Sequence, residues 1–328
     1  MTLARAAAYT RVIVETPTET SVSGPVADEY GTAGPFAATT GPVAAAPSSS
    51  SGANDWGPDN PPWGVAAGVL VWLASVLLLL IVPTLAGAAY VLTRMRGVPA
   101  DKLRELFIAD PKFILISVAA VIPAHLLTLW LIWWLVTAGG RRSLRAMLGL
   151  GWSRRLGPLE VFAWLGVVGL LFVANGLIAR YFQGGDTDLE KIITSSAAAR
   201  FVVVALATFT APAVEETVYR GVLYPALRRA TGQWRAVFVV AALFAGVHAW
   251  QYRQNVGVII AISLLSLTLT LVRAQTGRLL PCIIVHTLFN GVTSAAILYQ
   301  AHARAAHDAS AQGLLLLLAL GRAAGLHV

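Results

Sequence analysis

Long apolar runs separated by short polar segments dominate the chain after about residue 60. They cover about residues 65–92, 113–138, 161–182, 197–212, 236–250, 256–272, 279–298 and 314–326. Most reach or approach the ~20 apolar residues that a helix needs to cross a bilayer. Because only helices and closed barrels satisfy their backbone groups in lipid, the pattern predicts an all-α, polytopic membrane bundle of about eight transmembrane helices.

The first 60 residues follow no such pattern. They are rich in Ala, Thr, Pro, Ser and Gly and hold too few large apolar side chains to form a core. We therefore expect a disordered N-terminal tail over residues 1–60, followed by a transmembrane domain over residues 61–328. Within that domain, residues 61–158 hold the first two spans and a basic loop, residues 159–300 a central core, and residues 301–328 the last span.

Composition and charge agree with a membrane protein. Hydrophobic residues make up 57% of the chain and charged residues 12%, against roughly 25% charged residues in soluble domains. The formal net charge of +8 does not indicate nucleic-acid binding, because the basic residues lie in short loops between apolar runs. The loop after the second apolar run contains no acid and five arginines: Arg141, Arg142, Arg145, Arg154 and Arg155. Because basic loops favour the cytoplasmic side, we predict that this loop and both chain ends are cytoplasmic.

Residues 211–221 place two adjacent carboxylates and an arginine between apolar runs. Ionisable groups are costly inside a membrane and usually serve a function there. Glu216 and Arg220 are four residues apart, so on a helix they share a face and can pair. Glu215 points about 100° away and therefore faces a different space. We place this helix at the membrane edge.

Two further polar insertions follow in apolar surroundings. Phe244 precedes His248 by four residues, and His286 precedes Asn290 by four. On helices, His286 and Asn290 can thus point into one cavity, and Phe244 can wall the space beside His248. A carboxylate and a neutral imidazole suit the deprotonation of a water, and a second imidazole and an amide suit the stabilisation of an oxyanion. The pattern predicts hydrolysis of an acyl bond, most naturally a peptide bond.

Each feature also has a purely structural interpretation. A Glu–Arg pair at this spacing often only supports its helix, a lone histidine is often a hydrogen-bonded core residue, and an asparagine can bridge helices. The functional interpretation depends on three such insertions in consecutive membrane segments. Other polar residues are weaker candidates: His125 and Asn175 are isolated, Glu160 suits a helix start, and His302 and His307 are expected in a solvated loop.

The three insertions together resemble a known family. Residues 215–221 resemble the EExxxRG motif of the CAAX protease and bacteriocin-processing family, and residues 244–248 its FxxxH motif. The segment from Thr276 into His286 and Asn290 is similar to its third motif, HxxxN. The resemblance covers about residues 160–300, the central core, and implies an all-helical intramembrane glutamate-dependent endopeptidase without a cofactor or metal ligand.

The resemblance also implies a role for each motif residue. The first glutamate and the histidine of the second motif activate water, and the histidine and asparagine of the third stabilise the oxyanion. The implied catalytic residues are Glu215, His248, His286 and Asn290, and the implied supporting residues are Glu216, Arg220 and Phe244. Proteolysis is then expected near the cytoplasmic membrane face, on a membrane protein or peptide.

Two other functions stay open. In a zinc-dependent hydrolase, Glu215, His248 and His286 would be ligands with a fourth position for water, although the chain has no HExxH pair. In a membrane scaffold or transporter, the buried charges would serve an ion path, although no internal repeat is present. In each case we expect a multi-pass integral membrane protein, with a bacterial plasma membrane suggested by compact loops and alanine-rich composition. The expected partners are the bilayer and a membrane protein or peptide substrate, and not nucleic acid; in a bacterium a prenylated substrate would be unexpected.

Overall fold

The computed structural model describes residues 55–94, 96–99, 102, 110–182 and 188–323. Within these residues the chain is helical, and β-type pairing is limited to isolated bridges. The helices are α1 (Val65–Arg94), α3 (Pro111–Ala119), α4 (Val121–Thr137), α5 (Leu144–Leu148), α6 (Glu160–Tyr181), α7 (Asp188–Ser195), α8 (Ala197–Ala205), η1 (Leu206–Thr210), α9 (Ala211–Glu216), η2 (Thr217–Leu223), α10 (Tyr224–Thr231), α11 (Gln233–Gln251), α12 (Val256–Thr276) and α13 (Leu280–Ala323).

Seven helical stretches among the described residues are long and apolar enough to cross a membrane. Helices α3 and α4 form one of them, and α8 through α10, joined by the π-helical segments η1 and η2, form another. The others are α1, α6, α11, α12 and the first part of α13. The predicted polytopic all-helical fold is confirmed, and the chain is an integral membrane protein.

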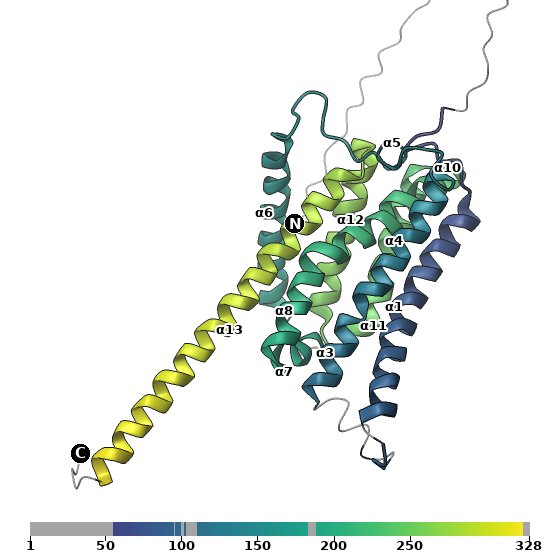
Figure 1. Ribbon diagram of the computed structural model, residues 1–328. Helices are drawn as coiled ribbons and strands as arrows, with labels where there is room; N and C mark the ends of the chain where they lie inside the picture. Colours follow the sequence, from purple (N-terminus) through teal and green to yellow (C-terminus); the bar gives the residue numbers. More distant parts are fainter. Residues whose placement is uncertain (1–54, 95, 100–101, 103–109, 183–187, 324–328) are drawn as a thin grey trace, which may run out of the picture. The chain divides into compact units, whose positions relative to one another are not determined.

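The last predicted span does not form a separate helix. Helix α13 continues without a break from Leu280 to Ala323, so the predicted loop containing His302 and His307 is helical. Residues 299–312 contain neither Gly nor Pro and are rich in Ala, the strongest helix former. The start of α1 and the far end of α13 lie at opposite ends of the bundle (Figure 1), whereas the two chain ends were predicted to lie on the same side.

The helix that carries Glu215 also differs from the prediction. Glu215 lies near the middle of one continuous helical stretch, Ala197–Thr231, and not in a separate helix that follows a span. Pro212 and Pro225 lie inside this span without ending it. In a regular α-helix, a proline ring clashes with the carbonyl four residues earlier. The wider π-helical turns of η1 and η2, which directly precede the two prolines, remove this clash.

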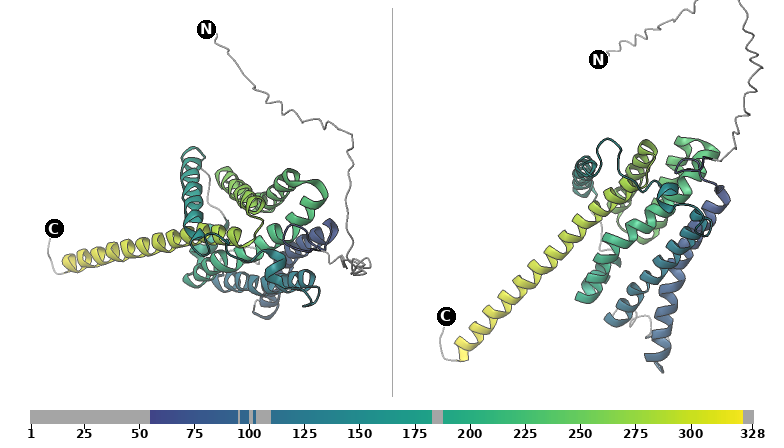
Figure 2. Two further views of the ribbon diagram at one scale, coloured as in Figure 1. Left: turned by 90° about the horizontal axis from the view of Figure 1, so that it is seen from above. Right: turned by 45° about the horizontal axis from the view of Figure 1, so that its top comes forward.

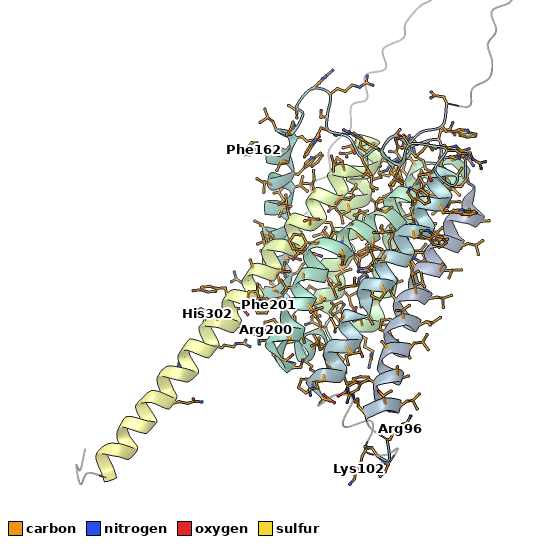
Figure 3. All side chains as sticks on the ribbon, viewed as in Figure 1. Arg96, Lys102, Phe162, Arg200, Phe201 and His302 are labelled. Atoms are coloured by element: carbon orange, nitrogen blue, oxygen red, sulfur yellow. The ribbon has the colours of Figure 1, made fainter. Side chains whose placement is uncertain are left out.

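Segment η2 lies at the centre of the bundle. All its residues are buried, and it contacts α1, α4, α5 and α11. The main apolar core forms around it from residues such as Val71, Ile132, Leu148 and Val240. Large apolar side chains cover the outside of the bundle instead, including Phe162 and Phe201 (Figure 3), as expected for helices that face lipid.

A second, smaller core joins α6 to α12 and α13. It contains Val168 and Leu171 of α6, Leu269 of α12 and Cys282 of α13. Helix α6 stands beside this pair of helices in both further views (Figure 2) and contacts both. Its first residue, Glu160, fits the predicted helix start. It is nevertheless buried, and its carboxylate oxygens accept hydrogen bonds of 2.8 and 2.7 Å from Arg278.

One end of the bundle is rich in arginine. Here lie α5, the loops on either side of it, and the turn between α10 and α11 (Figure 1). Most of the predicted tail lies outside the described residues, but residues 55–60 are described and belong to this end. Asp59 forms ion pairs with Arg273 and Arg228. The described part of the chain therefore begins before the predicted domain boundary.

Candidate active site

Glu216 and Arg220 form the predicted pair at the centre of the bundle. Arg220 Nη1 donates a hydrogen bond of 2.8 Å to Glu216 Oε1, and both side chains are 0% exposed. The other guanidinium nitrogens donate to Ser266 and Thr270 of α12. The Phe244 ring lies 4.8 Å from the guanidinium carbon. Arg220 is thus held by three helices, and it fixes one oxygen of Glu216.

His286 joins this pair from α13. Its Nδ1 lies 2.9 Å from Glu216 Oε1, the same oxygen that Arg220 contacts. A carboxylate accepts, so the Nδ1 hydrogen belongs to His286, and the Nε2 atom points to the other glutamate. The distance from His286 Nε2 to Glu215 Oε2 is 3.9 Å. Glu216 therefore orients the imidazole toward Glu215.

Glu215 occupies a different environment, as its position on the helix predicts. Its side chain is 22% exposed and lines a cavity of about 440 Å³. Every implied catalytic residue lines the same cavity. The lining also includes Phe244 and apolar residues of six further helical segments, among them Ile193, Val203, Ala207, Ile262 and Phe289. The structure thus brings the three polar insertions together around one apolar space.

His248 lies on the wall of this cavity beside Phe244. The two rings stack with their centroids 4.7 Å apart. His248 Nδ1 lies 2.8 Å from the Phe244 carbonyl oxygen. A carbonyl can only accept, so Nδ1 carries the hydrogen, and Nε2 of the neutral ring presents a lone pair. Phe244 therefore fixes both the ring plane and the tautomer of His248.

Asn290 contacts the π-helical segment η1. Its Nδ2 donates a hydrogen bond of 2.9 Å to the carbonyl oxygen of Ala207. Within η1, the Ala211 amide bonds to the Leu206 carbonyl, five residues earlier. The next donor in that series would come from Pro212, which has no N–H. Asn290 supplies this missing donor, which leaves its second amide hydrogen available to the cavity.

Asn175 and Tyr252 are polar residues of the cavity that were not among the predicted site residues. Asn175 of α6 was predicted to be isolated, but it lines the cavity, and its buried Oδ1 atom has no hydrogen-bond partner among the described residues. Tyr252 follows α11, and burial, then the charge of Glu215, raises its pKa to about 12. Tyr252 lies four residues after His248, so the spacing could have indicated it. No periodic signal pointed to Asn175.

The cavity lies toward one end of the bundle. Its lining includes Leu189 and Ile193 of α7 and Tyr252 in the turn between α11 and α12. These elements lie at the end opposite α5 and α10 (Figure 1). The predicted orientation places the arginine-rich end in the cytoplasm. With that orientation the cavity lies toward the opposite face, so it does not agree with the other prediction, of a site near the cytoplasmic face. The motif spacing did not define which end of each helix lines the cavity.

The arrangement of the His, Cys, Asp and Glu side chains bears on whether the cavity could hold a metal ion. Among the residues that the structure describes, no three His, Cys, Asp or Glu side chains are grouped closely enough to hold a metal ion. The hydrogen bonds above also commit Nδ1 of His248 and of His286 to protein acceptors. Each imidazole could therefore offer only Nε2 to a ligand in the cavity.

Part of the chain matches the model of a known family. Residues 197–292 match the family model described as type II CAAX prenyl endopeptidase, Rce1-like. The match begins with α8 and ends just after Asn290, so it contains all three polar insertions. No curated protein and no solved structure matches the chain.

Proposed function

We propose, from the match of residues 197–292 to the Rce1-like family model, that Glu215 and His248 activate the water that attacks a peptide bond. The match to that family model and the seven apolar helices among the described residues both support a membrane endopeptidase. The observation that carries the mechanism is the contrast between the neighbouring carboxylates. Glu216 is buried in its ion pair, while Glu215 faces a cavity that it shares with His248, His286 and Asn290.

The proposed reaction begins with a water held between the Glu215 carboxylate and Nε2 of His248. Glu215 accepts a proton as the water oxygen bonds to the carbonyl carbon of the substrate. When the C–N bond breaks, the protonated Glu215 returns that proton to the leaving amine. The low polarity of the cavity wall strengthens these charge interactions relative to water.

His286 and Asn290 are proposed to stabilise the oxyanion. Asn290 donates its second amide hydrogen. His286 already donates Nδ1–H to Glu216, so its Nε2 can donate to the oxyanion only when the ring carries both protons. The Glu216 carboxylate beside Nδ1 complements that positive ring throughout the reaction, and the Glu215 carboxylate near Nε2 complements it until Glu215 takes the proton of the water.

The lining of the cavity supports an apolar, membrane-associated substrate. Among the described lining residues of the cavity, Glu215 is the one acidic side chain, and there is no Lys or Arg. An uncharged protein segment or peptide therefore fits better than a charged one. We further propose that the protein acts in a bacterial plasma membrane on unprenylated substrates, although the family description names prenyl substrates.

The test compares peptides released by membranes that contain the wild type or Glu215→Gln, each with and without a chelator. A farnesylated peptide and its unmodified counterpart serve as added probes. Glu190→Gln, which alters an exposed carboxylate outside the cavity lining, is the matched control. We expect products that disappear in Glu215→Gln, persist in Glu190→Gln and survive chelation.

The other outcomes assign the alternatives. Products lost on chelation and restored by zinc would replace the water-activation mechanism with a zinc-dependent one. Identical peptide profiles for wild type and Glu215→Gln, with both proteins folded, would favour a scaffold or transporter. Cleavage of the farnesylated probe alone would contradict the proposed unprenylated substrate.

A further inference from the structure

Arg273 of α12 is a buried cation outside the cavity lining. Its side chain is 1% exposed, and it donates in three directions. Nε donates a hydrogen bond of 3.1 Å to the backbone carbonyl of Arg220, Nη1 one of 2.8 Å to Asp59 Oδ1, and Nη2 one of 2.6 Å to the Pro58 carbonyl. A buried guanidinium with all these partners is expensive to desolvate and holds its geometry closely.

The sequence explains why the Arg220 carbonyl needs this donor. In η2 the hydrogen bonds join residues five apart, and the Tyr224 amide bonds to the Tyr219 carbonyl. The corresponding partner of the Arg220 carbonyl is Pro225, which has no N–H. A buried carbonyl without a donor is unfavourable. Arg273 therefore replaces the hydrogen bond that Pro225 cannot make, as Asn290 does for Pro212 in η1.

The Arg220 backbone leads directly to the proposed site. The Arg220 side chain holds Glu216 Oε1, and that oxygen holds Nδ1 of His286. A shift of the η2 backbone at Arg220 would move the Arg220 guanidinium and, with it, the Glu216 carboxylate. The His286 imidazole, which is bonded to that carboxylate, would then move as well. Arg273 is connected to this chain of contacts by its hydrogen bond to the Arg220 carbonyl.

Residues 58–63, here named the anchor segment, complete the arrangement. Asp59 neutralises Arg273 and also pairs with Arg228 at 2.9 Å. Trp63 Nε1 donates a hydrogen bond of 3.0 Å to a second η2 carbonyl, that of Val222. Gly277 permits the close approach, because a Cβ atom there would lie 3.1 Å from Asp59 Oδ2. The anchor segment thus supports η2 at Arg220, through Arg273, and at Val222 directly.

We propose that Arg273, held by Asp59 of the anchor segment, is a positioning residue for the hydrolytic site. It sets the backbone of η2 at the point where Pro225 leaves a carbonyl without a donor. Glu216 and His286 take their positions from that backbone. The proposal rests on the proposed function for its effect on hydrolysis, but its effect on His286 is independent of hydrolysis.

The test restores the missing donor in a different way. Arg273→Met should lower kcat by about 100-fold with a smaller change in KM, since small misplacements at a site are costly. Adding Pro225→Ala to Arg273→Met returns an N–H to position 225 and should recover much of that loss. Pro225→Ala alone should stay near the wild type. Arg235→Met, an exposed arginine at the same end of the bundle, is the matched control and should change neither parameter.

A second readout does not need a substrate. In the inactive Glu215→Gln background, the Nδ1–H resonance of His286, assigned with His286→Gln, should shift in Arg273→Met and return on addition of Pro225→Ala. Asp59→Asn, on the anchor segment, should shift it in the same direction and covers the case in which Arg273→Met does not fold. An unchanged resonance in both variants would overturn the proposal. A shifted resonance, together with a wild-type protein that cleaves no peptide, would instead refute the proposed function alone.

Discussion

At the scale of single residues, the contrast between Glu215 and Glu216 is the most informative feature. The two side chains are adjacent in sequence, but one belongs to a buried ion pair and the other lines a cavity. Equivalent substitutions should therefore have different effects. A change at Glu216 acts on folding, and one at Glu215 acts on chemistry.

Glu216→Gln should destabilise the protein by roughly 3–5 kcal/mol, because it leaves the buried Arg220 charge without its partner. Glu215→Gln should cost less than about 1 kcal/mol, since its side chain is partly exposed. Denaturant unfolding of purified protein in one detergent would measure both values. Equal losses of stability would contradict the structural distinction between the two residues.

Tyr252 gives a prediction about pH. Burial first, and then the charge of Glu215, raises its pKa from the ordinary value of 10.0 to about 12. Folding therefore favours the protonated phenol, and this contribution is complete below pH 10 and is lost as the pH rises through about 12. The thermal midpoint of the wild type should fall more steeply over that interval than that of Tyr252→Phe. Tyr299→Phe, an exposed tyrosine on α13, should follow the wild type; parallel curves for all three would refute this prediction.

At the scale of elements, two π-helical segments shape the span that carries the glutamates, and a proline follows two residues after the end of each. Each leaves one carbonyl without its backbone donor, and a side chain from another helix supplies the hydrogen bond. In η1 that side chain is Asn290, which the family resemblance assigns to the oxyanion. Asn290 therefore has a structural partner as well as a proposed chemical one.

A double-mutant cycle separates the two roles of Asn290. Asn290→Leu should cost about 1–3 kcal/mol of stability, because the Ala207 carbonyl loses its donor. In a Pro212→Ala background the restored N–H should reduce this cost, while activity stays low. The control background is Pro83→Ala, a proline inside α1 that does not contact η1. The same stability cost in all three backgrounds would show that the hydrogen bond to Ala207 is unimportant.

At the scale of the whole molecule, charge defines the two ends of the described bundle. Arginine gathers at one end, in the residues Arg141, Arg142, Arg145, Arg154, Arg155, Arg228, Arg229, Arg235 and Arg278. The other end carries both signs, for example Lys112 beside Asp110. Since basic residues mark the cytoplasmic side, we expect the cavity in the half of the membrane away from the cytoplasm.

Cysteine labelling tests this orientation. Cys282 is the only cysteine of the chain and is buried, so a Cys282→Ala background is simple to make. A membrane-impermeant maleimide on intact cells should label Arg253→Cys, in the turn beside Tyr252, and should label Arg154→Cys only after lysis. The opposite pattern would invert the orientation and place the cavity toward the cytoplasm.

Local spacing was sufficient to predict much of this arrangement. The Glu216–Arg220 pair, the Phe244–His248 contact and the common direction of His286 and Asn290 all follow from residues four apart on a helix. The π-helical segments were not predictable, because they depend on backbone packing around a proline. The Asp59–Arg273 pair was also not predictable. It joins residues more than two hundred positions apart, which helical periodicity does not relate.

The two prolines also have a consequence for how this region tolerates changes in length. Pro212 and Pro225 enclose both glutamates and Arg220 and fix where each wide turn occurs. Deleting or inserting one residue between them would rotate Glu215 and Glu216 by about 100° relative to one proline. The number of residues between the prolines is therefore as constrained as their identity. Related sequences should show substitutions in this interval but no gaps.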